Sequence, residues 1–245
     1  MAPTTILTSP LTYSVIIPVK NEEENIAPLL QEIEPVMKAF GKEWELICID
    51  DGSTDGSLKV LKELAKTRPY LRLIVFSKNC GQSSAFDAGF KAARGTYIIT
   101  LDADGQNDPA DIPKLVEAIK DCDMVVGWRL NRKDTLSKRI TSRLANLVRS
   151  RYCHDGLHDT GCSLKIYRAE CVRKIKLYHG THRFLGSLFC IEGFRIKEVV
   201  VNHRERTKGQ SKYHFFNRSL SPFVDMLAVH WMSKRRLRYE IKEQL

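Results

Sequence analysis

One stretch decides the fold: Thr96-Tyr-Ile-Ile-Thr-Leu-Asp-Ala-Asp-Gly-Gln-Asn-Asp108. Its apolar run, residues 97–101, predicts a buried β-strand that ends in two carboxylates, Asp102 and Asp104. In an open α/β sheet, ligands bind at the carboxyl ends of the strands. Two carboxylates there repel each other and lose hydration unless a cation joins them, and a divalent metal that also binds phosphate oxygens meets that need. A polar turn with a helix cap is the alternative for Asp-x-Asp alone, so the rest of the chain has to decide.

Strands and helices alternate on both sides of this stretch. The predicted strands of this half of the chain cover residues 13–19, 44–50, 72–76, 97–101 and 123–127. Apolar residues at helical spacing predict helices after the first four strands. The alternation predicts the α/β class, with a mostly parallel, Rossmann-like sheet flanked by helices. The sequence has no Gly-x-Gly-x-x-Gly after the first strand and no Walker A loop, which argues against a dehydrogenase-type dinucleotide fold and a P-loop NTPase.

Turn chemistry predicts where several of these helices begin and end. Pro35 should bend or end the first helix. Ser53 or Thr54 should cap the second helix, and the third, from Ser84, should be closed by Gly95.

The second half of the chain begins with an arginine-rich segment, residues 128–151, whose apolar residues share a helical face. This segment predicts an amphipathic helix with a basic face. Residues 159–168 should end in a short strand, with a helix following from Ala169. Residues 195–203 predict another strand, and residues 204–213 a basic loop that contains glycine.

Charge is unevenly distributed along the chain. The net charge is +10, yet residues 1–127 hold 13 Lys+Arg and 19 Asp+Glu, so the remainder is strongly basic. The basic half is compatible with nucleic acid, anionic lipid or a phosphorylated substrate. No window of about 18 consecutive apolar residues occurs, so no membrane-spanning helix is predicted. Residues 1–10 do not have the pattern of a signal peptide.

The seven cysteines favour a reducing compartment, because their number is odd and no Cys-x-x-Cys occurs. A zinc site is an alternative use for four residues, although their spacing matches no closed zinc motif. These residues are Cys153, His154, His158 and Cys162.

Several polar motifs occur in a fixed order along residues 12–240. They are Val15-Ile-Ile-Pro-Val-Lys-Asn-Glu-Glu23, Asp50-Asp-Gly-Ser-Thr-Asp55, Asn79-Cys-Gly-Gln-Ser-Ser-Ala-Phe-Asp-Ala-Gly89, Leu101-Asp-Ala-Asp-Gly-Gln-Asn-Asp-Pro109, Asp159-Thr-Gly-Cys-Ser, His182-Arg-Phe184 and Val201-Asn-His-Arg-Glu-Arg-Thr-Lys-Gly-Gln-Ser-Lys-Tyr213. With these motifs the chain resembles the family 2 glycosyltransferases of GT-A fold, and within them the polyprenyl-phosphate glycosyltransferases typified by dolichol-phosphate mannosyltransferase. Asp-Ala-Asp-x-Gln and Gly-Gln-Ser-Lys-Tyr, in that order, are the most specific portion of the match.

The resemblance implies a hexosyltransferase that moves a sugar from GDP-mannose or a UDP-sugar to a dolichyl or undecaprenyl phosphate. It implies a site for Mg²⁺ or Mn²⁺ that bridges the donor's diphosphate and stabilises the leaving nucleotide. The implied metal ligands are Asp102, Asp104 and Gln106. Contacts to the base and ribose are implied for Pro18, Asn21, Glu22 and Asp51. Closure over the diphosphate is implied for Arg206, Ser211 and Lys212.

On the acceptor side, the resemblance implies that Arg129 and Arg139 hold the acceptor's phosphate, which suits the geometry of arginine. Asp159 is the one further candidate for orienting the sugar or the acceptor, and a turn or cap aspartate is its alternative role. The resemblance therefore implies a catalytic group of Asp104, Asp159, Arg129 and Arg139. Trp128 departs from the family, which usually has a small polar residue there.

Residues 12–213 are expected to form the catalytic domain, and residues 214–245 a basic amphipathic helix on the membrane surface. Ser221-Pro222 predicts the start of a helix that runs to about Arg238. Its apolar face and basic end suit an anionic membrane, peripherally on the cytoplasmic face. Packing of that face on the protein's own core, or on a partner membrane subunit, are the alternatives. The residues of this face are Phe216, Leu220, Phe223, Val224, Leu227, Ala228 and Trp231.

Two other functions compete with a lipid-phosphate acceptor. A family 2 enzyme of cell-envelope biosynthesis that glycosylates a saccharide or glycolipid hydroxyl needs a general base, and no Glu or His beyond Asp159 is well placed. A non-enzymatic nucleic-acid-binding module would explain the net charge. It would leave Asp102, Asp104 and Gln106 without a role, and no aromatic-basic RNA signature supports it.

Overall fold

The computed structural model describes residues 11–130, 155–206, 220–237, 239 and 241–243. Most of the predicted helix 128–151 and a stretch of the basic loop 204–213 lie outside these residues.

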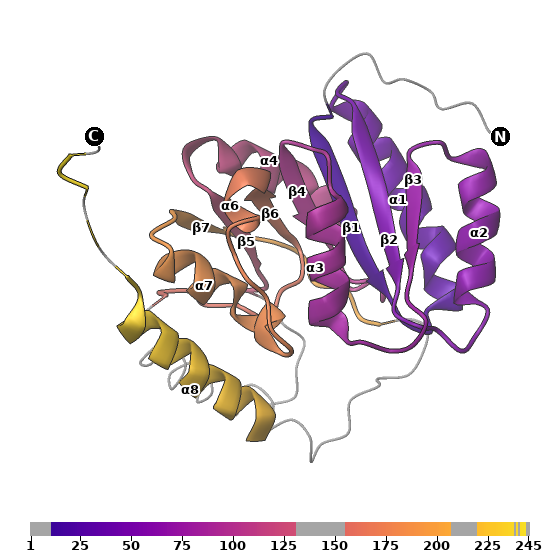
Figure 1. Ribbon diagram of the computed structural model, residues 1–245. Helices are drawn as coiled ribbons and strands as arrows, with labels where there is room; N and C mark the ends of the chain where they lie inside the picture. Colours follow the sequence, from indigo (N-terminus) through magenta and orange to yellow (C-terminus); the bar gives the residue numbers. More distant parts are fainter. Residues whose placement is uncertain (1–10, 131–154, 207–219, 238, 240, 244–245) are drawn as a thin grey trace.

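Within the described residues, seven strands form one sheet in the order β3-β2-β1-β4-β6-β5-β7 (Figure 1). The sheet is mostly parallel, and only β6 runs antiparallel to its neighbours, β4 and β5. The predicted α/β class and sheet type are confirmed. The strands are β1 (Tyr13–Val19), β2 (Trp44–Asp50), β3 (Leu71–Val75), β4 (Tyr97–Thr100), β5 (Met124–Trp128), β6 (Lys165–Arg168) and β7 (Ile196–Val200).

Helices cover both faces of the sheet. One face packs against α1 (Glu23–Ala39), α2 (Ser57–Thr67) and α4 (Ile112–Ala118), with 3-10 turns η1 (Pro109–Asp111) and η2 (Ile119–Asp121) on either side of α4. The other face packs against α3 (Gln82–Ala92), α6 (Ala169–Val172) and α7 (Leu185–Ile191), with the 3-10 turn η3 (Thr181–Phe184) preceding α7. These two apolar layers bury every central strand.

Pro18 separates β1 from β4 at their carboxyl ends. The amide of Leu101 donates to the carbonyl of Ile16, so the next residue of β1 facing β4 is Pro18. Proline has no N–H to donate, and the ladder between the two strands stops at Ile16 and Thr100. On its other side β1 stays paired with β2 as far as Val19 and Asp50. The sheet is therefore split where β4 leads into Asp102.

Two local predictions about helix ends are wrong, and a third fails in one of its two forms. Pro35, expected to bend or end the first helix, does not end it, because α1 continues to Ala39. Helix α2 begins at Ser57, because Ser53 and Thr54 bind the loop after β1 instead of capping a helix. Gly95 does not close α3, which starts two residues before Ser84 and ends at Ala92. A side chain at Gly95 would lie 2.6 Å from the backbone nitrogen of Ser14, so the glycine instead allows close approach to β1.

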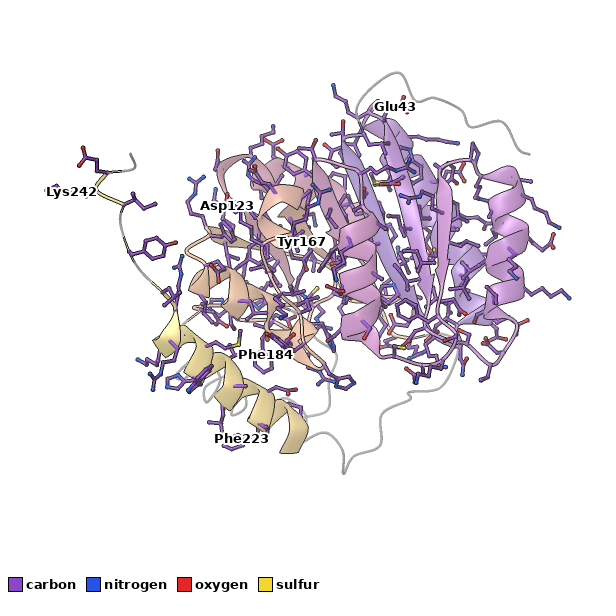
Figure 2. The ribbon with its side chains drawn as sticks, in the orientation of Figure 1. Glu43, Asp123, Tyr167, Phe184, Phe223 and Lys242 are labelled. Carbon is purple, nitrogen blue, oxygen red and sulfur yellow. The ribbon has the colours of Figure 1, made fainter. Side chains whose placement is uncertain are left out.

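The final helix, α8 (Leu220–Arg235), packs on the outside of α7 and η3. Met226 and Val229 are buried against Phe184 and Leu188. Figure 2 shows Phe184 on the side of α8 that faces the body and Phe223 on the opposite side. Four residues of the predicted apolar face, Phe223, Val224, Leu227 and Trp231, are 47%, 56%, 41% and 62% exposed and do not pack on the core. The side chains of Phe216 and Leu220 lie outside the part that the structure describes. None of the described helices is long and apolar enough to cross a membrane.

Glu45 anchors the amino ends of the strands through a buried network. Its carboxylate accepts hydrogen bonds from Ser14 Oγ at 2.7 Å and from the Arg94 amide at 2.7 Å, and it pairs with Arg72 at 2.5 Å. Burial alone would raise the pKa of Glu45, but the hydrogen bonds from Arg72, Ser14 and the Arg94 amide outweigh it and lower the pKa below its ordinary value.

We expect Glu45→Gln to lower the free energy of unfolding by about 2 kcal/mol at neutral pH, because buried donors lose a charged acceptor. Since the folded pKa is depressed, this contribution is present above the unfolded pKa and lost as pH falls through the folded pKa. Urea unfolding of both proteins should therefore converge below about pH 4. Glu63→Gln, in an exposed pair with Lys66, is the control and should change stability by less than about 0.5 kcal/mol. A Glu45→Gln penalty that does not change with pH would contradict the assignment.

Candidate active site

The candidate site lies where the strand order of the sheet reverses, with β2 and β3 on one side of β1 and the later strands on the other. Strand β1 has β2 on one side and β4 on the other, which makes it a topological switch point. Pro18 ends the ladder between β1 and β4, and at such a switch point the loops after the two strands are expected to border a ligand-binding crevice. The residues predicted for the base, the ribose and the metal lie at the end of β1 and in the loops after β1, β2 and β4.

Asp102 and Asp104 leave β4 toward different neighbours. Asp102 Oδ1 accepts a hydrogen bond of 2.8 Å from Gln82 Nε2, at the first turn of α3. Asp104 Oδ1 accepts one of 3.1 Å from the backbone amide of Gln106, which tightens the turn at Gly105. The Gln106 side chain has no hydrogen-bond partner among the described residues. The three implied metal ligands thus share one short turn.

The charge on Asp102 is destabilised by its surroundings. Burial raises its pKa, and the neighbouring charge of Asp104 raises it further. Ser163, Lys165 and Arg129 act in the opposite direction. Lys165 is 5% exposed, and its ammonium donates to the carbonyl of Cys162. A buried lysine and a nearly buried arginine therefore supply positive charge near Asp102.

The segment after β7 is fixed to the turn that carries these carboxylates. Asn107 and His203 form an antiparallel bridge, and the Arg204 amide donates to the carbonyl of Gln106 at 3.0 Å. The Arg204 guanidinium then spans from Asp108 on this turn to Glu32 on α1.

Arg206 reaches the crevice at the end of this segment. Its Nη2 donates to Glu22 Oε1 at 2.7 Å, and its Nη1 lies 4.0 Å from Asp104 Oδ2. Glu22 is 8% exposed and also accepts from Asn25. The structure therefore brings together three predicted site residues: Glu22, Asp104 and Arg206.

The loops after β1, β2 and β3 hold one another in place. Asn21, in the left-handed region at φ 50°, accepts a 2.7 Å hydrogen bond from the Thr54 amide. Asp51, 5% exposed, accepts from the backbone amides of Cys80 and Gly81 at 2.6 and 2.9 Å. A side chain at Gly52 would lie 2.6 Å from the carbonyl carbon of Lys78. Asn21 and Asp51 thus shape the crevice through protein contacts.

Arg129 and Asp159, both predicted for the acceptor side, form a bidentate pair. Arg129 Nε and Nη2 donate to the two oxygens of Asp159 at 2.7 and 2.9 Å, and the Arg129 amide donates at 3.2 Å. Their side chains are 12% and 8% exposed. Burial alone would lower the pKa of Arg129, but its bond to Asp159 and the charge of Asp159 raise it. The neighbouring Trp128 stacks on the ring of His158, with ring centroids 4.4 Å apart.

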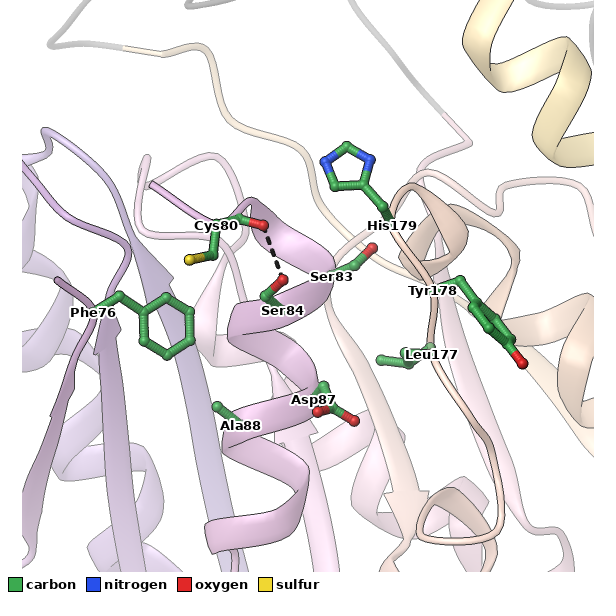
Figure 3. A pocket seen from close by; sticks show the side chains of 9 residues that line it. All are labelled: Phe76, Cys80, Ser83, Ser84, Asp87, Ala88, Leu177, Tyr178 and His179. Carbon is green, nitrogen blue, oxygen red and sulfur yellow. Dashed lines mark hydrogen bonds between the residues drawn. The ribbon is translucent and has the colours of Figure 1, made fainter. Parts of the chain in front are cut away.

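His182, which belongs to a motif with no implied role, bonds to α3. Its Nδ1 lies 2.7 Å from Ser83 Oγ, and burial, with the charges of Arg183, Lys165 and His179, lowers its pKa to about 3. A recess of about 350 Å³ lies beside this contact, on the outer face of α3 (Figure 3). It is lined by Phe76, Cys80, Ser83, Ser84, Asp87, Ala88, Leu177, Tyr178 and His179, none of which was predicted as a site residue.

Residues 14–176 match the family model described as Glycosyl transferase family 2. The chain belongs to this family. The predicted family is thereby confirmed, and with it the class of enzyme, a glycosyltransferase.

Two family 2 relatives carry names that mention lipid phosphates. The chain is 39% identical over 234 residues to the dodecaprenyl-phosphate galacturonate synthase of Rhizobium johnstonii, covering 93% of this chain and 69% of that protein. It is 39% identical over 204 residues to the undecaprenyl-phosphate 4-deoxy-4-formamido-L-arabinose transferase of Pectobacterium carotovorum, covering 82% of this chain. The chain spans 62% of the length of that second relative.

Solved structures show the same fold at low identity. Glucosyl-3-phosphoglycerate synthase from Mycobacterium tuberculosis, in complex with Mn²⁺, UDP and phosphoglyceric acid, aligns with a TM-score of 0.69 at 16% identity, covering 93% of this chain and 80% of that one. A mannosyltransferase from Pyrobaculum calidifontis with GDP-mannose and Mn²⁺ aligns with a TM-score of 0.64 at 19% identity, covering 95% and 66%. The predicted GT-A architecture is confirmed.

Several predicted residues of this family 2 chain lie outside the described residues: Arg139, Ser211 and Lys212. So do Cys153 and His154 of the zinc alternative, while His158 pairs with Glu198 and Cys162 is buried. No group of three or more His, Cys, Asp or Glu side chains arranged for a metal occurs in the portion of the chain that the structure describes.

Two residues of the site were missed in the sequence. Gln82 lies inside the matching segment 79–89, so its polar side chain at the start of a helix was a usable signal. No sequence signal marked Lys165, because the surroundings of a single lysine in a short strand cannot be predicted until the strand order of the sheet is known.

We expect Asp51→Ala to free the loop after β3, since the amides of Cys80 and Gly81 lose their hydrogen bonds to a buried carboxylate. Hydrogen exchange at Cys80 and Gly81 should accelerate about tenfold or more. Asp87→Asn, an exposed carboxylate on α3, is the control and should leave both rates unchanged. Unchanged exchange in Asp51→Ala would mean that other contacts hold the loop.

Proposed function

We propose that this family 2 enzyme transfers a sugar from a nucleotide sugar, either GDP-mannose or a UDP-sugar, to a polyprenyl phosphate. The two relatives named above act, by their names, on dodecaprenyl and undecaprenyl phosphate, and the first covers 93% of this chain. The observation that carries the proposal is the Arg129–Asp159 pair, because it favours a phosphate acceptor over a hydroxyl acceptor.

The pair favours a phosphate in two ways. Asp159, the one further candidate for a general base, uses both oxygens on Arg129. Arg129 is left with Nη1, which has no hydrogen-bond partner among the described residues and is suited to a phosphate oxygen. A hydroxyl acceptor would need a base, whereas a phosphate monoester, with a second pKa of about 6, is already largely ionised at neutral pH.

The donor set at the crevice fits a divalent cation such as Mg²⁺ or Mn²⁺. Burial and the neighbouring charge of Asp104 destabilise the charge of Asp102, and the Gln106 amide oxygen adds a third hard ligand to the two carboxylates. When bound, the ion would neutralise charge on the leaving diphosphate. Solved neighbours of the same fold contain Mn²⁺ or Mg²⁺ with a nucleotide, which supports the same use here.

The remaining residues of the crevice would orient the donor. Pro18, Asn21, Glu22 and Asp51 lie at or next to the ends of β1 and β2, where they would face the base and ribose. Arg206 now bonds Glu22 beside Asp104 and would turn its guanidinium to the diphosphate, together with Ser211 and Lys212. Arg139 would join Arg129 at the acceptor's phosphate.

The reaction is a single displacement. A phosphate oxygen of the acceptor forms a bond to the anomeric carbon of the sugar. The bond from that carbon to the diphosphate breaks, and its electron pair leaves with the nucleoside diphosphate. No proton has to be removed from the acceptor, and attack opposite the leaving group inverts the anomeric centre.

The exposed face of α8 would hold the enzyme against the membrane that contains the acceptor. Phe223, Val224, Leu227 and Trp231 form an exposed apolar strip, and Lys234 and Arg235 follow at its end. Figure 1 shows α8 toward the end of the molecule to which the carboxyl ends of β1 and β2 point. The odd number of cysteines and the lack of Cys-x-x-Cys favour a reducing compartment, which supports the cytoplasmic face. A partner membrane subunit would compete for the same strip.

We expect Asp104→Asn to lower sugar transfer at least about a hundredfold, because the metal and diphosphate lose a charged ligand. The assay incubates the protein with Mn²⁺, radiolabelled GDP-mannose or UDP-sugars, and undecaprenyl or dolichyl phosphate, and counts label in the lipid extract. Asp121→Asn, an exposed carboxylate at the end of η2, is the control and should retain most activity. Label on a saccharide instead of lipid would refute the acceptor, and normal transfer by Asp104→Asn would refute the metal site.

A second variant tests the membrane strip on α8. Replacing Phe223, Leu227 and Trp231 together with serine should reduce sedimentation with vesicles of mixed neutral and anionic phospholipid about tenfold or more, since the apolar area that enters the interface is lost. The control replaces Val75 and Val200, exposed apolar residues on other elements. Unchanged sedimentation of the triple variant would exclude α8 as the membrane contact.

A further inference from the structure

We propose that Glu198 is a positioning residue that holds Asp159, and through it the Arg129 guanidinium, in the orientation that receives the acceptor's phosphate. This inference rests on the proposed function. No sequence motif marks Glu198, which lies in the middle of β7 and is 11% exposed.

The Glu198 carboxylate fixes the turn that carries Asp159. Its Oε1 accepts hydrogen bonds from the backbone amides of His158 at 2.9 Å and Asp159 at 3.1 Å. Its Oε2 lies 2.7 Å from Nδ1 of the His158 ring. One side chain thus binds two consecutive amides and the ring of the first of those residues, so the turn cannot shift along β7 without breaking several charged hydrogen bonds.

Trp128, at the end of β5, packs against the turn that Glu198 binds. Its indole stacks on the His158 ring with an interplanar angle of 17°, and Trp128 lies directly opposite Val200 in the β5–β7 pairing. The large side chain of Trp128 therefore packs against the ring that Glu198 holds. Arg129 follows Trp128 in the chain, so both members of the Arg129–Asp159 pair are attached to one rigid unit.

The orientation matters because the contact between Arg129 and Asp159 is directional. Two parallel N–H donors meet two oxygens, and a bidentate contact of this kind fixes the plane of the guanidinium. The contact with Asp159 therefore also fixes the direction in which Arg129 Nη1 points. A displacement of Asp159 of about 1 Å would misdirect Nη1 and weaken the acceptor complex, while the donor residues after β1, β2 and β4 would be unaffected.

The position of Glu198 distinguishes it from its neighbours on the same strand. Lys197 points away from the turn and pairs with Asp121 at 3.2 Å, and both side chains are exposed. Lys197→Gln is therefore a matched control, since it removes an ion pair from β7 without touching the turn.

The experiment measures steady-state kinetics of Glu198→Ala, Glu198→Gln, Trp128→Ser and Lys197→Gln with undecaprenyl phosphate and the nucleotide sugar that the unmodified protein uses. We expect the KM for undecaprenyl phosphate to rise about tenfold in Glu198→Ala and less in Glu198→Gln, which keeps one oxygen acceptor. Trp128→Ser should change KM in the same direction, and Lys197→Gln should not. The KM for the sugar nucleotide, and the calorimetric affinity for UDP or GDP with Mn²⁺, should stay within about twofold.

The outcomes separate this inference from the proposed function. If the unmodified protein puts no label into lipid, the proposed function fails and the inference falls with it. If it labels lipid but Glu198→Ala leaves the KM for undecaprenyl phosphate unchanged, the inference alone is overturned. Parallel loss of donor affinity and acceptor affinity in Glu198→Ala would also overturn it, because that result marks a purely structural role.

Discussion

Repulsion between two neighbouring carboxylates is the constraint around which the rest of the site is arranged. Asp102 and Asp104 are held on one turn, and burial makes the negative charge of Asp102 still more costly. Each surrounding element contributes a compensation: Gln82 from α3, Lys165 from β6, Arg129 from the position after β5 and Arg206 from the segment after β7. These partners reduce the excess of negative charge without cancelling it, and in the proposed function a divalent cation with a diphosphate would meet the remaining demand.

The position of that turn depends on a missing hydrogen bond. Pro18 cannot extend the ladder from β1 to β4 beyond Ile16, so the two strands diverge just before Asp102. A donor at Pro18 would draw Leu101 and the carboxylates back into the sheet. The divergence of β1 and β4 therefore places the two carboxylates directly after a buried, apolar strand.

Sequence patterns predicted the regular elements of this molecule well, because strands such as Tyr13–Val19 and Trp44–Asp50 are continuous apolar runs between turn residues. They failed where loops bind each other. Ser53 and Thr54 have the chemistry of helix caps but contact Asn21, a partner 32 or 33 residues away. The carboxylates of the site followed from their motif. The pairing of Arg129 with Asp159 and the role of Glu198 did not, because both depend on which strands lie next to β5.

The antiparallel strand β6 lies next to β5, a pairing that the sequence did not predict. By entering between β4 and β5, it places Lys165 near Asp102 and directs the preceding residues, including Asp159, to Arg129 at the end of β5. The charges of Arg129, Lys165, Asp102 and Asp159 consequently lie within electrostatic range of one another. Neutralising the carboxylates with a cation therefore alters the field at Arg129 as well. The proposed donor and acceptor sites, which are built from different loops, would in this way be coupled electrostatically through β6, so that binding at one would change the charge balance at the other.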